Sequence, residues 1–106
     1  MNFQSNTGEV ITLQEASEMT KRFRESTLNT GTIALAAGGD LVLQILSQTG
    51  CKGVRMYFAL DADNQIQLVM VGVDENGDDM YEGVLVDRLS ICPPKCSAKN
   101  ALNGIG

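Results

Sequence analysis

A chain of 106 residues with 43% hydrophobic and 20% charged residues has the composition of one globular domain, which excludes an intrinsically disordered chain. The net charge of −5 disfavours nucleic acid as a partner, because phosphate binding requires clustered Lys and Arg. No apolar stretch approaches the roughly 18 residues of a membrane span, and residues 1–8 lack a signal-peptide pattern. We therefore expect a single cytoplasmic domain over residues 1–106 that does not bind membranes.

The first predicted element is an amphipathic helix that begins after Thr12 and continues to about Ser26. Thr12 and Glu15 have the spacing of a capping box, in which each side chain satisfies a free amide of the first helical turn. Helical steps then place a mostly apolar set of residues on one face: Leu13, Ala16, Met19, Thr20 and Phe23. After this helix, residues 32–36 fit either a short strand or the start of a helix, and we favour the strand.

A second helix is predicted over residues 41–48. Asp40 is a good N-cap residue, and Gly50 suits the left-handed position that follows a helix. The apolar face of this segment is wide, so we expect the helix to be largely buried.

The strongest pattern is a β-hairpin formed by residues 54–60 and 66–74, joined by an Asp- and Asn-rich loop. In the first strand Met56 and Phe58 share one face, while Arg55 and Tyr57 share the other. The second strand is apolar on both faces, which predicts either an interior position in the sheet or cover by a partner subunit. Residues 84–86 could add a short strand.

Together these elements predict an α+β fold, with a small antiparallel sheet built on the central hairpin, packed by two helices, and an irregular C-terminal tail around Pro93 and Pro94. The apolar second strand also favours a homodimer, since a short chain has few elements to cover both of its faces.

Catalysis has little support in the sequence. The chain contains no histidine, which removes the commonest general base and the commonest metal ligand. The paired carboxylates Asp61 with Asp63 and Asp78 with Asp79 lie in predicted turns, where Asp is favoured for local hydrogen bonding. Neither acidic loop has the glycine and glutamate spacing of a calcium-binding EF-hand. We assign no catalytic or cofactor-binding residue and expect a protein that is not an enzyme.

The three cysteines form the one constellation that could carry a metal. Cys51, Cys92 and Cys96 could supply thiolates to zinc or to an iron–sulfur cluster, with a carboxylate or a second subunit completing the site. The alternative is that Cys51 is a small buried apolar residue, while Cys92 and Cys96 are free thiols or a pair that shapes the tail. An odd number of cysteines leaves at least one thiol free.

The chain resembles a group of short bacterial proteins, without an assigned function, that end in Cys-Pro-Pro-x-Cys. The matching segments are spread along nearly the whole chain: residues 11–16, 50–57, 71–79 and 92–96. A weaker similarity to A-type iron–sulfur cluster carriers involves residues 11–16, 50–53 and the two tail cysteines, although this chain has Cys-x-x-x-Cys where those proteins have Cys-x-Cys. The resemblance implies no activity. We expect an interaction or accessory module that binds a protein partner, and a thiolate metal protein is the alternative.

Overall fold

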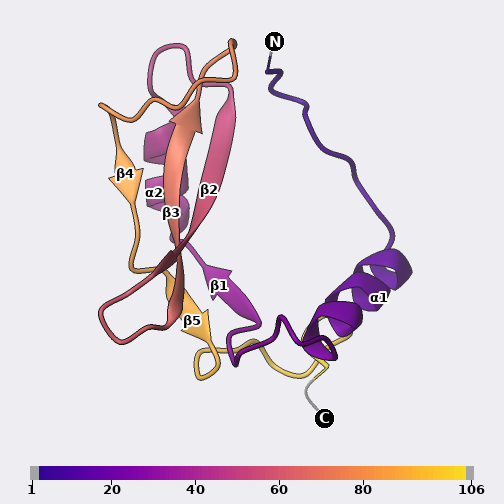
Figure 1. Cartoon of the computed structure of the whole chain (residues 1–106). Coiled ribbons are helices and arrows are strands. Elements are labelled where there is room, and N and C mark those ends of the chain that lie inside the picture. Colours follow the sequence, from indigo (N-terminus) through magenta and orange to yellow (C-terminus); the bar gives the residue numbers. More distant parts are fainter. Residues whose placement is uncertain (1–2, 105–106) are drawn as a thin grey trace. The chain divides into compact units, whose positions relative to one another are not determined.

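The computed structural model describes residues 3–104, which form two compact units (Figure 1). The first unit contains the described residues up to Gly8 together with Ala36–Leu89. The second contains Glu9–Leu35 and the chain from Ser90 onward. Across the described part of the chain, no helix has the length and apolar character needed to cross a membrane.

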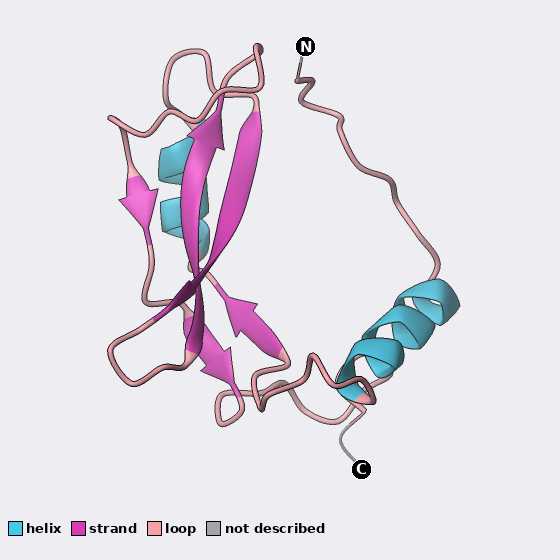
Figure 2. Cartoon of the chain, viewed as in Figure 1, coloured by secondary structure: helices cyan, strands magenta, loops and turns pink. Residues whose placement is uncertain are grey.

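A three-stranded antiparallel sheet and one helix make up the first unit (Figure 2). The strands lie in the order β2 (Gly53–Leu60), β3 (Ile66–Val73) and β4 (Leu85–Val86), and the helix is α2 (Gly39–Leu46). The predicted hairpin is confirmed: β2 and β3 pair along their whole length, from Gly53 opposite Val73 to Leu60 opposite Ile66. The short strand expected near residue 85 is β4.

The position of β3 explains why its sequence is apolar on both faces. It is the central strand of the sheet, and Met70 and Gly72 on one face and Val71 and Val73 on the other are all buried. A side chain at Gly72 would lie 3.0 Å from both the Cys51 sulfur and the Gln48 amide nitrogen. The segment that follows α2 therefore covers the face of the sheet that carries Gly72.

The start of α2 differs from the prediction. The N-cap is Gly38, in an extended conformation, and the helix begins at Gly39, so Asp40 lies inside the first turn instead of capping it. Because the chain enters the helix earlier than expected, no side chain caps the N-terminus. Asp40 can still favour the helix through the attraction between its charge and the N-terminal dipole. Gly50 has a φ of 84°, which confirms the left-handed position after the helix.

The second unit contains α1 (Leu13–Arg24) and two short strands, β1 (Ala34–Ala36) and β5 (Ser90–Cys92), which form a separate sheet. The Thr12 hydroxyl accepts a hydrogen bond from the Glu15 amide at 3.1 Å, which confirms the half of the predicted capping box that Thr12 supplies. The strand expected within residues 32–36 is also confirmed. The tail is more ordered than predicted, because the Ile33 amide donates to the Cys92 carbonyl and β5 pairs with β1.

Of the two helices expected to pack the sheet, α2 does so within the first unit, whereas α1 belongs to the second. The expectation that α2 is largely buried was wrong, because Ile45 is its one buried residue. No residue of α1 is buried, and Leu13 and Met19 on its apolar face are exposed. The end of α1 is held by Arg24, whose guanidinium donates to the Leu102 carbonyl at 2.6 Å.

Candidate functional site

A row of exposed apolar side chains runs along β2. Met56, Phe58 and Leu60 project from the same face, because alternate residues of a strand point the same way, and they are 52%, 88% and 66% exposed. Leu68 and Ile66 on β3 lie opposite Phe58 and Leu60 and are half-buried. We call these five residues the hairpin apolar face. Isolated exposed apolar residues are common, but a contiguous row is typical of an interaction surface.

The same strand lies at the edge of its sheet. The strand order places β3 on one side of β2 and no strand on the other among the described residues. An edge strand presents backbone amides and carbonyls that are free to pair with another chain. The exposed apolar side chains and the free backbone edge therefore belong to one strand.

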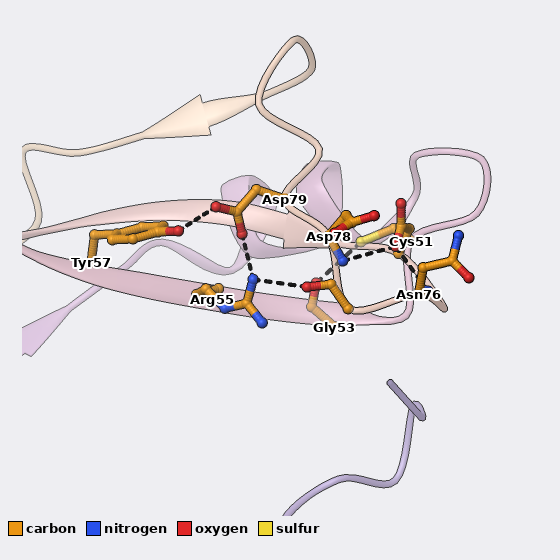
Figure 3. A network of polar contacts seen from close by, with 9 residues as sticks. Cys51, Gly53, Arg55, Tyr57, Asn76, Asp78 and Asp79 are labelled. Carbon is orange, nitrogen blue, oxygen red and sulfur yellow. Dashed lines mark hydrogen bonds and ion pairs between the residues drawn. The ribbon is translucent and has the colours of Figure 1, made fainter. Parts of the chain in front are cut away.

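A polar network lies on the opposite face of β2 (Figure 3). Arg55 donates to the Asp79 carboxylate at 2.6 Å and to the Gly77 carbonyl at 3.1 Å. The Tyr57 hydroxyl donates to the other oxygen of the same carboxylate. These contacts connect the edge strand to the acidic turn that follows β3.

The turn itself is organised by Asp74, whose carboxylate accepts hydrogen bonds from the amides of Asn76 and Asp78 at 2.9 and 3.0 Å. Gly77 has a φ of 84°, a left-handed conformation that favours glycine. This local geometry carries the chain back toward β2 and brings Asp79 opposite Val73, within reach of Arg55.

The network shifts the pKa of each of its three side chains. The pKa of Asp79 is lowered, first because Tyr57 donates to the carboxylate and then because Arg55 does. The pKa of Tyr57 is raised, mainly because its hydroxyl donates to Asp79, and the pKa of Arg55 is raised by the same carboxylate. A carboxylate with a lowered pKa is a weak base and a tyrosine with a raised pKa is a weak acid, so this arrangement does not favour proton transfer near neutral pH.

Cys51 is a half-buried free thiol in the first unit. It follows α2 and precedes β2, and its sulfur lies 3.2 Å from the Gly53 carbonyl, to which the thiol donates. Its environment is that of a small side chain packed beside Gly72. The free thiol predicted from the odd cysteine count is therefore Cys51.

Cys92 and Cys96 are joined in a disulfide within the second unit. Cys92 is buried at the end of β5, and the bridge closes the short loop that contains Pro93, Pro94 and Lys95. The sequence left open whether Cys92 and Cys96 are metal ligands, free thiols or a pair that shapes the tail. In the structure they are that pair. A thiolate metal site on them would first require reduction of the disulfide. Within residues 3–104, no group of three or more Cys, Asp or Glu side chains is placed to hold a metal ion.

A hollow lies within each unit. In the first unit it is lined by Phe3, Gln4, Ser5, Asn6, Lys52 and Glu75. In the second unit the hollow lies against the end of α1 and is lined by Met19, Thr20, Phe23, Arg24, Ile33 and Leu102. Neither contains a cysteine or any member of the polar network.

Sequence patterns placed Arg55 and Tyr57 on one strand face but did not identify Asp79 as their common partner. The sequence signal that could have identified Asp79 was the acidic turn directly after the strand that pairs with β2. No protein family, curated protein or solved structure matches this chain.

Proposed function

We propose that this chain is a non-enzymatic interaction module that binds protein through the hairpin apolar face. The observation that carries the proposal is the exposure of Met56, Phe58 and Leu60 in one row on an edge strand. Burial of apolar surface contributes roughly 25 cal/mol per Å², so covering a side chain as exposed as Phe58 favours association. We further propose that the protein acts as a homodimer in the cytoplasm, and the resemblance implies that the cell is bacterial.

Two features support a protein partner over a nucleic acid or a chemical substrate. The net charge of −5 opposes binding to phosphate backbones. Tyr57 and Arg55 keep the Asp79 carboxylate deprotonated, and Asp79 keeps the Tyr57 hydroxyl protonated. Their role is to fix the acidic turn against the strand that carries the apolar face.

The proposal is tested by replacing Phe58 with Ser, which removes the most exposed side chain of the row. Tyr81→Ser is the matched control, because Tyr81 is also a well-exposed aromatic residue but lies outside the hairpin. Both variants and the wild type are compared by sedimentation velocity and by quantitative capture of binding proteins from a bacterial lysate. We expect Phe58→Ser to weaken self-association at least tenfold and to lose specific captured proteins, while Tyr81→Ser retains both. If the two variants behave alike, the hairpin apolar face is not the binding surface.

The cytoplasmic location has its own test, because reducing compartments rarely preserve disulfides. Trapping thiols in intact cells with a maleimide reports the state of Cys92 and Cys96. Reduced cysteines fit the cytoplasm, whereas a fully oxidised pair in the cell contradicts that location.

A further inference from the structure

We propose that β2 pairs antiparallel with β2 of a second copy, around a twofold axis at Tyr57, to form one continuous six-stranded sheet. This inference rests on the proposed function, since it names the partner and the geometry of the same surface. The three-stranded sheets of the two copies would join along their β2 edges.

The free edge of β2 lacks the features that usually prevent such pairing. Natural edge strands are protected by Lys, Pro, bulges or short length. β2 is eight residues long, contains neither Lys nor Pro, and pairs with β3 without an interruption in register. Its single charged residue, Arg55, is already bound to Asp79. A second copy therefore meets no unpaired like charge along the strand.

The register follows from the alternation of side chains. A twofold axis perpendicular to the sheet keeps the hairpin apolar faces of both copies on the same side of the joined sheet. Each residue of one β2 strand must then lie opposite a residue of the other β2 strand that points to the same side. With the axis at Tyr57, Met56 lies opposite Phe58 of the second copy, and Val54 lies opposite Leu60. The thioether of Met56 then contacts an aromatic ring, a favourable pairing.

Charge also favours this register. Lys52, which directly precedes β2, comes level with the acidic hairpin loop of the second copy, which contains Asp61 and Asp63. The twofold axis repeats this contact at both ends of the paired strands, which selects antiparallel over parallel pairing.

The test places a cysteine on the axis. Tyr57→Cys is made in a Cys51→Ser background, so that the introduced thiol is the free one and the Cys92–Cys96 disulfide stays intact. Asp63→Cys in the same background is the control, because its two copies would lie roughly 40 Å apart along the paired strands. Under copper-catalysed air oxidation, we expect the Tyr57→Cys protein to form a disulfide-linked dimer at least tenfold faster than the Asp63→Cys protein.

A second version of the test leaves the Tyr57–Asp79 hydrogen bond in place. Val54→Cys and Leu60→Cys proteins, each in the Cys51→Ser background, are oxidised separately and as a mixture. We expect the mixture to cross-link faster than either protein alone, since residues 54 and 60 oppose each other across the axis.

The outcomes separate this inference from the proposed function. Equal cross-linking at all positions, in a protein whose self-association still depends on Phe58, overturns edge pairing and leaves the hairpin apolar face as the binding surface. A wild-type protein that sediments as a monomer at about 100 μM overturns the second copy as the partner, and the lysate comparison of Phe58→Ser then decides the proposed function alone.

Discussion

The side-chain amide of Gln67 forms two hydrogen bonds with the backbone of Leu89, accepting from its amide at 3.1 Å and donating to its carbonyl at 3.0 Å. Gln67 is the one buried polar side chain among the described residues, and Leu89 is buried as well. The Gln67 side chain thus bonds the backbone of Leu89 as a neighbouring strand would, at a position after the end of β4.

Gln67→Leu should destabilise the first unit, because it leaves the amide and carbonyl of Leu89 buried without partners. The expected loss in free energy of unfolding is about 2 kcal/mol, the usual cost of orphaned buried groups. Urea denaturation followed by circular dichroism measures it. Gln65→Leu, in the exposed hairpin loop, is the control and should change stability by less than about 0.5 kcal/mol. Similar effects from both substitutions would mean that the Leu89 contacts contribute nothing.

The uncapped start of α2 leads to a stabilising substitution. Gly39 is the first residue of the helix, and a β-carbon there would have no atom within 4 Å. Gly39→Ala should therefore raise the free energy of unfolding by about 0.5–1 kcal/mol, since alanine loses less conformational entropy in a helix. Gly50→Ala should have the opposite effect, because Gly50 has a φ of 84° that strains a side chain. The midpoint of thermal denaturation should be higher than that of the wild type for Gly39→Ala and lower for Gly50→Ala.

The hairpin could be predicted because its signals are local. Alternating apolar residues and a turn-rich loop determine pairing between neighbouring segments, and the observed register from Gly53 to Leu60 follows from them. The two apolar faces of β3 predicted either an interior position or cover by a partner subunit, and the structure has the interior position. The start of α2 was not predicted correctly, because Gly38 and Asp40 are both acceptable N-caps and only the path of the chain decides between them.

The exposed row on β2 and its polar network depend on contacts distant in sequence. The alternation pattern places Met56 and Phe58 on one face but does not say that this part of the face stays uncovered. The partnership of Arg55 and Tyr57 with Asp79 depends on how the turn after β3 returns to the strand. The pairing of Cys92 with Cys96 was one of several alternatives that spacing alone could not separate.

Asp79 should make the stability of the first unit depend on pH in the acid range. Its pKa is lowered from the ordinary 3.8 because Tyr57 and Arg55 donate to the carboxylate. A group with a lowered pKa contributes stability above the pKa of the unfolded chain and loses it as the pH falls through the folded value. The difference in unfolding free energy between wild type and Asp79→Asn should be constant from pH 7 to about 5 and shrink below about 4. Asp78→Asn, at the neighbouring exposed carboxylate, is the control variant.

Tyr57 should titrate in the alkaline range at a position set by Asp79. Its pKa is raised from the ordinary 10.0 because the neutral hydroxyl donates to the carboxylate. A raised pKa means that this contact stabilises the fold below the unfolded pKa and is lost as the pH rises through the folded value. In a Tyr81→Phe background, Tyr57 is the sole tyrosine, so tyrosinate absorbance reports it directly. Asp79→Ala should move the titration to lower pH, and an unchanged midpoint would show that the hydroxyl and carboxylate do not interact in solution.

The cysteines should divide into one free thiol and one closed pair. Protein unfolded without reductant should react with one equivalent of a thiol reagent, and with three after reduction, as the Cys92–Cys96 disulfide and free Cys51 require. The double variant Cys92→Ser, Cys96→Ser should lose about 2 kcal/mol or less, since the closed loop is short. Metal analysis and an absorption spectrum on protein purified under reducing conditions, without oxygen or chelator, complete the test. We expect no stoichiometric zinc or iron, because the described structure places no third ligand beside the pair. Metal that is present in the wild type and absent from the double variant would instead establish a thiolate site and replace the interaction module as the primary function.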